Sequence, residues 1–215
     1  MQNWQFIITV KAQKTLADVQ ALGAEAFLFQ GDLTKVENIT KFFDEAISKF
    51  GTIDIAINTV GMVLKKPFTE TTEKEYDTMS DINSKVAYFF LQEAGKKVAD
   101  HGKICTIVTS LLAAYTGLYS TYAGMKAPVE HFTRAASKEF GARGISVTAV
   151  APGPMDTPFF YGQEADDAVA YHKSASALGG LTDIKDIAPL VEFLVTDGYW
   201  ITGQTIFANG GYTTR

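Results

Sequence analysis

Tyr122 and Lys126 stand four residues apart in the run Ser120-Thr-Tyr-Ala-Gly-Met-Lys126. On a helix, residues at this spacing share one face, with about 5–6 Å between their Cβ atoms. A lysine ammonium so placed favours the phenolate of its neighbour, which predicts a tyrosine that exchanges protons near neutral pH. Ser110 ends an apolar run twelve residues earlier and supplies a hydroxyl to hold the oxygen that receives the proton. These side chains predict proton transfer to or from a carbinol oxygen.

The pair of Tyr122 and Lys126 is weak evidence when taken alone. With average amino-acid usage, about 0.7 Tyr-x-x-x-Lys pairs are expected by chance in a chain with this many tyrosines and lysines. This sequence contains one such pair. The alternative interpretation is a surface ion pair on an ordinary helix. The choice between a catalytic pair and a surface pair therefore depends on the elements around it.

Composition limits the classes of protein to consider. The chain has 215 residues, 47% of them hydrophobic, which suffices for a single domain over residues 1–215. Its formal net charge is -5, so no basic surface predicts binding to nucleic acid. The sequence contains no run of about eighteen apolar residues that would predict a membrane span. The first residues lack the basic start of a secretory signal, so we expect a cytoplasmic protein.

The cysteine and histidine residues predict neither a disulfide nor a metal site. Cys105 is the only cysteine, which fits a reducing compartment and a buried small side chain. His101, His131 and His172 lack the spacing of metal ligands, so we interpret them as structural or surface residues and expect no metal.

Apolar runs typical of strands alternate with longer segments of helical period. We expect strands at residues 5–10, 26–33, 53–60, 103–110, 145–151 and 204–208. We expect helices at residues 16–22, 36–50, 72–98, 119–140 and 183–195, with a loop over residues 154–180. This alternation predicts an α/β fold, a doubly wound parallel sheet with helices on both faces.

Three segments that follow expected strands carry polar or glycine residues. Gly61, Ser110 and the pair Pro152-Gly153 each fall at or just beyond a carboxyl end. Open parallel sheets bind ligands in the crevice outside the carboxyl ends of their strands. The three segments are therefore expected to converge on one site with Tyr122 and Lys126, and this convergence favours a catalytic pair over a chance one.

Further short motifs complete a recognisable pattern. They are Gly31-Asp-Leu-Thr34, Asn58-Thr-Val-Gly61, Asp81-Ile-Asn-Ser84, Pro152-Gly153 followed by Thr157, and Asn209-Gly-Gly211. Together with Ser110, Tyr122 and Lys126, they resemble the short-chain dehydrogenase/reductase family, most closely its 3-oxoacyl-carrier-protein-reductase-like branch. The resemblance extends from about Phe6 to Tyr212. It implies a single Rossmann-like domain and an NAD(P)(H)-dependent oxidoreductase that interconverts a carbonyl and a secondary alcohol.

The resemblance also implies catalytic roles. Tyr122 is the acid/base, Lys126 lowers the pKa of that tyrosine and binds the nicotinamide ribose, and Ser110 orients the carbonyl. Asn83 links the lysine to solvent through a water. The alternative interpretation of Asn83 is a polar residue stabilised by a backbone carbonyl.

Cofactor contacts follow from the same motifs. The resemblance places Asp32 and Leu33 beside the adenine. Asn58 and Gly61 belong to the turn after a strand, which departs from the family pattern at Thr59 and Val60. Pro152, Gly153 and Thr157 lie over the nicotinamide, and Tyr122 and Lys126 contact the same cofactor. Capping of turns and bridging of strand ends are the alternative roles for Asp32, Asn58 and Thr157.

The glycine-rich loop that binds pyrophosphate in this family, Thr-Gly-x-x-x-Gly-x-Gly, does not occur in the sequence. The first glycine is Gly23, and no two of the 18 glycines stand two residues apart. The chain begins where the second strand of the family would lie, so we expect an N-terminally truncated sheet that lacks the first βα unit. A cofactor-deficient, non-catalytic binding or scaffold relative, or a truncated inactive form, is the alternative function.

Cofactor choice, substrate and assembly complete the expectations. The segment Val10-Lys-Ala-Gln-Lys14 carries two lysines and no carboxylate, so NADP(H) is favoured over NAD(H), with Lys11 as a contact. An ordinary solvated helix start is the alternative. Residues 116–121 and 159–171 are expected to shape a pocket for a small apolar or ring-bearing carbonyl or alcohol. The family resemblance implies a homodimer or homotetramer.

Overall fold

Four parallel strands form the centre of the computed structural model, which describes residues 10–114 and 116–214. The strands are β1 (Ile55–Asn58), β2 (Lys103–Ile107), β3 (Ser146–Pro152) and β4 (Thr205–Ala208), in the order β1-β2-β3-β4. All three pairings are parallel, so the carboxyl ends of the strands lie at the same edge of the sheet. The expected doubly wound α/β fold is confirmed.

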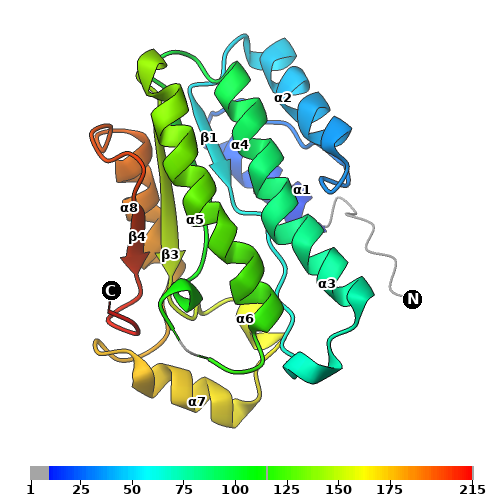
Figure 1. Cartoon of the computed structure of the whole chain (residues 1–215). Coiled ribbons are helices and arrows are strands. Elements are labelled where there is room, and N and C mark those ends of the chain that lie inside the picture. Colours follow the sequence, from blue (N-terminus) through cyan, green and yellow to red (C-terminus); the bar gives the residue numbers. More distant parts are fainter. Residues whose placement is uncertain (1–9, 115, 215) are drawn as a thin grey trace.

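Helices cover both faces of this sheet (Figure 1). One face carries α2 (Val36–Phe50), α4 (Val86–Lys97) and α5 (Ser120–Phe140), while α8 (Ile184–Val195) packs against β2 and β3 from the other. Every residue of β3 is buried, which explains why its sequence shows no alternation of polar and apolar residues. None of the helices that the structure describes is long and apolar enough to cross a membrane.

The expected helix over residues 72–98 consists of three consecutive pieces. They are α3 (Glu73–Ser80), a π-helical turn η2 (Asp81–Lys85), and α4. Thr72 begins α3 with a capping box, since its hydroxyl accepts from the Glu75 amide and the Glu75 carboxylate accepts from the Thr72 amide. π-Helical turns occur frequently at functional sites, and this one carries Asn83.

The N-terminal part of the chain differs most from the expectation. The strand expected at residues 5–10 lies outside the described residues except for Val10, which begins helix α1 (Val10–Ala21). The strand expected at residues 26–33 is wrong, because this segment is irregular and pairs with no described strand. Its aromatic rings still pack on α2, with ring centroids 5.7 Å apart for Phe27 and Phe50. The apolar pattern is therefore that of a partly buried segment that pairs with no described strand.

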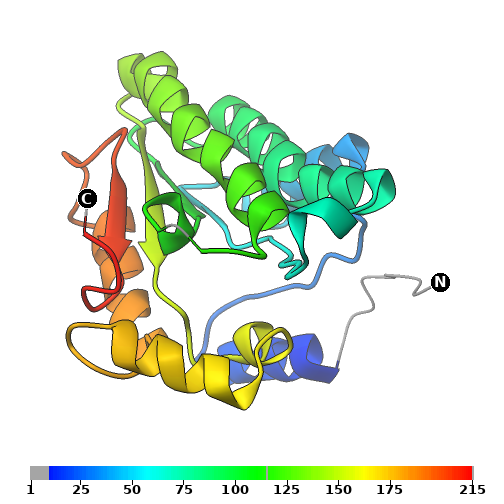
Figure 2. The same ribbon diagram turned by 60° about the horizontal axis from the view of Figure 1, so that its bottom comes forward.

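Short helices occupy segments that the sequence pattern left irregular. The loop expected at residues 154–180 contains α6 (Pro158–Tyr161) and α7 (Asp166–Ala175), which lie beyond the carboxyl ends of the strands in both views (Figures 1 and 2). α7 begins with two acidic residues and carries Lys173 in its last turn, an arrangement that the helix dipole favours. Single turns of 3₁₀-helix occur at η1 (Phe68–Glu70), η3 (Ser110–Leu112) and η4 (Gly141–Arg143).

The outer edge of β1 has no partner strand within the described part of the chain. Ile55 and Ile57 are 43% and 41% exposed, whereas Ala56 and Asn58, which alternate with them, are buried. This alternation shows that one face of β1 is open rather than covered. The two isoleucines instead form part of the wall of a cavity that reaches to the ends of the strands.

Candidate active site

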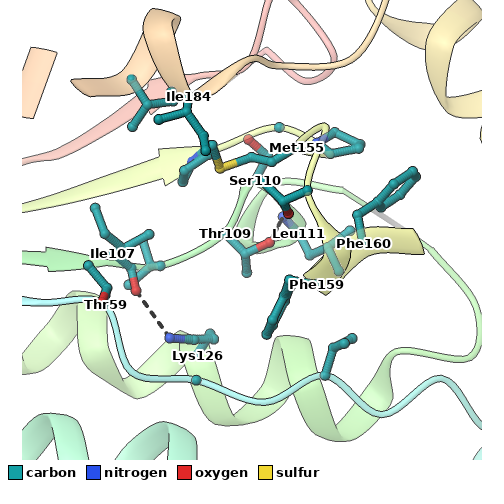
Figure 3. Close-up of a pocket in the computed structure, with 18 of the residues that line it drawn as sticks. Thr59, Ile107, Thr109, Ser110, Leu111, Lys126, Met155, Phe159, Phe160 and Ile184 are labelled. Carbon is teal, nitrogen blue, oxygen red and sulfur yellow. Dashed lines mark hydrogen bonds between the residues drawn. The ribbon is translucent and has the colours of Figure 1, made fainter. Parts of the chain in front are cut away.

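A cavity of about 1060 Å³ opens at the carboxyl ends of β1, β2 and β3 (Figure 3). Its wall includes Gly61, Ser110, Tyr122, Lys126, Pro152, Gly153 and Thr157. The expected convergence of three strand ends on the Tyr122–Lys126 pair is thus confirmed. From the segments expected to shape a pocket, Tyr119, Phe159, Phe160, Gln163 and Glu164 also line it.

Tyr122 lies in the first turn of α5 and is 9% exposed. Burial raises the pKa of Tyr122 to about 12, and a hydrogen bond with the Thr109 hydroxyl offsets part of this rise. The expectation that Lys126 lowers the pKa of Tyr122 is therefore wrong for the structure as it stands. The neutral phenol is the stable form here, which suits a group that donates a proton.

Lys126 is directed at main-chain oxygens rather than at the phenol. Its Nζ donates hydrogen bonds to the carbonyl oxygens of Val60 and Ile107, both at 3.1 Å, and the second bond is drawn in Figure 3. The side chain is 3% exposed, and burial lowers the pKa of Lys126 to about 8. The lysine therefore links the ends of β1 and β2 and carries a proton that it can release near neutral pH.

Asn83 holds the turn that follows β1. Its Oδ1 accepts from the Met62 amide at 3.1 Å, and its Nδ2 donates to the carbonyl oxygens of Met62 at 2.9 Å and Met79 at 3.1 Å. These bonds agree with the alternative interpretation of Asn83, a polar side chain stabilised by backbone groups. A Cβ at Gly61 would lie 3.2 Å from Asn83 Oδ1 and 3.0 Å from Lys126 Nζ, so only glycine leaves these groups undisturbed.

Ser110 lies at the first position of η3, directly beyond β2, and is 2% exposed. Its hydroxyl donates to the Ala151 carbonyl oxygen at 3.0 Å and accepts from Asn209 Nδ2 at 3.0 Å. Both bonds fix the Oγ atom at the cavity wall. Asn209 belongs to the Asn209-Gly-Gly211 motif, and its contact with Ser110 joins segments that are 99 residues apart.

The segment after β3 forms the opposite wall. Gly153 has no room for a side chain, because a Cβ would lie 2.8 Å from Thr182 Oγ1 and 3.2 Å from Asn209 Cα. Thr157 precedes α6, and its side chain makes no capping hydrogen bond. The alternative role of Thr157 as a cap is therefore not realised, and its side chain lines the cavity.

The remaining expected cofactor contacts lie outside this cavity wall. Asn58 is 2% exposed, its Oδ1 accepts from the Val60 amide at 2.9 Å, and its Nδ2 is a buried donor without a partner among the described residues. Asp32 Oδ1 accepts from the amide and the hydroxyl of Thr34, and Leu33 packs against the core. Lys11 belongs to α1, but its side chain lies outside what the structure describes.

Sequence reasoning missed a polar cluster at the wall of the same cavity, in which Lys65 backs the lining residues Glu164, His172 and Tyr212. Lys65 Nζ contacts Glu164 Oε2 at 2.5 Å, and His172 Nδ1 lies 3.0 Å from the Tyr212 hydroxyl. His172 is 7% exposed, which agrees with its interpretation as a structural residue, and it also lines the cavity. The four residues come from four separate segments, and no local spacing signals their contact.

The nicotinamide cofactor implied by the resemblance fits one part of these residues. Gly61 passes close beside Lys126, and Lys126, Gly153 and Thr157 line the same cavity, so these are the groups that would hold a nicotinamide and its ribose. The sequence offers no glycine-rich cradle for the pyrophosphate. No cluster of His, Cys, Asp or Glu within residues 10–114 and 116–214 is arranged to hold a metal ion.

Comparisons with known proteins extend over almost the whole chain. A family model described as enoyl-(acyl carrier protein) reductase matches residues 2–213. The hydroxynaphthalene reductase-like protein Arp2 of Metarhizium brunneum is 33% identical over 224 residues, which cover 94% of this chain and 81% of that protein.

Solved structures agree with these relatives. A chain described as a dehydrogenase of Burkholderia cenocepacia with bound NADP is 65% identical, with a TM-score of 0.93 over 95% of this chain and 79% of that one. A blue fluorescent protein from a metagenomic library in complex with NADPH is 28% identical, with a TM-score of 0.87 over 94% of this chain and 82% of that one.

Proposed function

Because this chain belongs to the short-chain dehydrogenase/reductase family and is an NAD(P)-dependent oxidoreductase, we propose that it reduces a ring-bearing ketone with Tyr122 as the proton donor. The substrate is a small molecule that enters the cavity at the strand ends. Its carbonyl oxygen lies within reach of Tyr122 and Ser110, and its carbon faces the side of the cavity bounded by Lys126, Gly153 and Thr157.

One observation carries this proposal: a neutral phenol, a lysine and a serine hydroxyl line a single, predominantly apolar cavity. The nicotinamide supplies the hydride when it is bound. Tyr122 donates its proton to the carbonyl oxygen, and the high pKa of its phenol keeps this proton available throughout the neutral range. The phenolate left on Tyr122 regains its proton from solvent that enters the cavity after the product leaves, while Lys126 holds the ends of β1 and β2 together. Ser110 orients the carbonyl oxygen after exchanging its bond to Ala151 for one to the substrate.

The apolar and aromatic walls support the proposed substrate class. Phe159 is 49% exposed and lies over the reacting residue, with its ring centroid 6.3 Å from that of Tyr122. Phe160 lines the same side of the cavity and stacks edge-on against His172 at 5.4 Å. A flat ring between these side chains buries apolar area on both of its faces. The name of the Metarhizium relative, a hydroxynaphthalene reductase-like protein, points to the same substrate class.

For the cofactor, we propose a preference for NADPH over NADH. The side chains of Lys14 and Asp18, which form an ion pair, are 74% and 61% exposed. A pair this exposed contributes little stability, so Lys14 remains available to bind a 2′-phosphate. Lys11 precedes it in the same helix. The NADP and NADPH bound in the two structural relatives support this preference.

We also propose a homodimer or homotetramer that packs through α4 and α5. Tyr88 on α4 is 46% exposed, and its ring stacks edge-on against Phe132 of α5 at 5.1 Å. This aromatic pair, with Tyr88 exposed and Phe132 partly buried, suits an interface between copies of the chain. Light scattering of the purified protein measures the assembly, and a Tyr88→Glu variant is expected to shift it toward the monomer.

The proposed reaction is tested by following NADPH oxidation with tetralone, a bicyclic ketone. Replacing Tyr122 with phenylalanine removes the proton donor and is expected to lower kcat by about 10²- to 10⁴-fold. The matched control is Tyr161→Phe, which removes an exposed hydroxyl bonded to Asp156. Near-normal turnover in Tyr122→Phe, with the control unchanged, would show that Tyr122 is not the acid.

A further inference from the structure

Glu164 has a buried carboxylate at the wall of the cavity. Its side chain is 0% exposed, and its Oε2 accepts from Lys65 Nζ at 2.5 Å. The second oxygen, Oε1, is buried without a hydrogen-bond partner in the part of the chain that the structure describes. Glu164 is one of the residues that line the cavity. An unsatisfied buried acceptor costs free energy, so a ligand that supplies a donor at this point gains affinity.

The charges around Glu164 define which donor fits. Lys65 balances the carboxylate, and His172 Nε2 lies 3.8 Å from the same Oε2 atom. Burial lowers the pKa of His172 by more than the nearby Glu164 carboxylate raises it. The pKa therefore lies below its ordinary value, and the ring is neutral near pH 7. The cluster thus contains one positive and one negative charge. A neutral hydroxyl satisfies Oε1 without adding a third charge to a buried site.

The surroundings of Glu164 define the rest of the ligand. Lys65 Nζ also lies 5.8 Å from the ring centroid of Tyr119, and the rings of Phe160 and His172 are 5.4 Å apart. Aromatic rings therefore lie beside Lys65 and His172, the two residues that neighbour the carboxylate. A ring system can reach Glu164 while keeping its contacts with these aromatic rings. A flexible polar chain would leave the same rings partly exposed to solvent.

We propose that Glu164 Oε1 accepts a hydrogen bond from a hydroxyl group on the substrate, so that the enzyme selects ring ketones that carry a hydroxyl away from the reacting carbonyl. Lys65 is a positioning residue that holds the carboxylate in place. The inference rests on the proposed function, because it assigns the second end of the same substrate. It makes Glu164 a specificity-determining residue that does not take part in the proton transfer.

Binding measurements test this inference without requiring turnover. Isothermal titration compares the hydroxytetralone isomers with unsubstituted tetralone and with the matching methoxytetralones, which keep the size but cannot donate. At least one hydroxytetralone is expected to bind about 10- to 100-fold more tightly than both analogues, as for a hydrogen bond to a charged acceptor. Glu164→Gln is expected to remove most of this difference while leaving the affinity for tetralone within about twofold.

Two further variants keep the test decisive. Glu192→Gln makes the same chemical change at another glutamate of the cavity wall, one that is exposed, and is expected to leave the discrimination unchanged. If Glu164→Gln does not fold, the double variant Lys65→Met/Glu164→Met removes both charges together and is expected to lose the discrimination. Equal affinities for all ligands in the parent chain, no binding of any, or discrimination that survives loss of the carboxylate would each overturn the inference.

The same ligands separate this inference from the proposed function. Turnover of tetralone and hydroxytetralones with equal kcat/KM would leave the reductase standing and refute the role of Glu164. Selective binding of a hydroxytetralone without any NADPH-dependent turnover would support the role of Glu164 and refute the proposed reductase function.

Discussion

Asn209 Nδ2 donates a hydrogen bond of 3.0 Å to the hydroxyl of Ser110, across 99 residues of sequence. The same amide is held by its own turn, because Nδ2 also donates to Thr213 Oγ1 at 2.8 Å and Oδ1 accepts from the Gly211 amide at 3.0 Å. The turn after β4 thereby fixes the serine at the end of β2. Because Asn209 donates to the Ser110 oxygen, the proton of that hydroxyl points away from Asn209, toward the Ala151 carbonyl oxygen.

Replacing Asn209 with alanine is expected to loosen Ser110 and to lower kcat by about tenfold, with a smaller effect on KM, because orientation of the reacting oxygen is lost. Loss of the buried hydrogen bonds also lowers the free energy of unfolding by about 1–3 kcal/mol. The matched control is Thr213→Val, which removes only the other side-chain partner of Asn209. Steady-state kinetics in which both variants reduce kcat equally would contradict a specific role for the Asn209–Ser110 bond.

Gly61 offers a second test, since its backbone passes directly beside the Lys126 side chain. A Cβ in Gly61→Ala would meet Lys126 Nζ at 3.0 Å and Cε at 3.2 Å, so the lysine side chain must move by a few tenths of an ångström. We expect kcat/KM to fall by about tenfold with little change in Tm, because the flexible end of the lysine yields more easily than the backbone.

Gly124→Ala is the control for that change. Gly124 lies in α5 between Tyr122 and Lys126, and a Cβ there would meet nothing within 4 Å. Alanine in place of a helical glycine is expected to stabilise the protein by about 0.5–1 kcal/mol and to leave kcat/KM unchanged. A larger loss of activity in Gly124→Ala than in Gly61→Ala would show that the space beside Lys126 is not what matters.

The strands and helices with strong apolar patterns were predictable from the sequence. Helix α2 has the predicted bounds, because its apolar residues recur at helical spacing and Gly51 ends it at a φ of 82°. The segment at residues 26–33 was not predictable, since an apolar run does not reveal whether a neighbouring strand exists to pair with it. The weakly amphipathic α7 was missed for a different reason: its charges at the two ends stabilise it more than any apolar face.

The site was predictable where its residues come from short motifs. Ser110, Tyr122 and Lys126 line the same cavity as the sequence indicated. Spacing alone could not show where the Lys126 ammonium points, and the structure directs it to the Val60 and Ile107 carbonyls. Nor could spacing reveal Glu164, because its partners Lys65 and His172 come together only through the tertiary fold.

The burial of Lys126 has a consequence for stability that depends on pH. Its pKa is about 8 in the folded chain, against 10.5 for an exposed lysine. Between these two values the unfolded chain binds more protons than the folded chain, so the free energy of unfolding rises with pH. Below pH 8 the folded protein holds a buried charge at a cost of about 3 kcal/mol, and this cost disappears as the pH approaches 10.5.

Replacing Lys126 with methionine is therefore expected to abolish turnover and raise Tm at pH 7, because it removes the buried charge but keeps the packing. The difference in Tm between the variant and the parent chain should shrink as the pH rises from about 8 to about 10.5. Thermal unfolding across this range measures it, with Lys138→Met, an exposed lysine of the same helix, as the control whose pH dependence stays that of the parent. A Lys126→Met chain that is less stable than the parent at every pH would mean that the bonds to Val60 and Ile107 outweigh the cost of burying the ammonium.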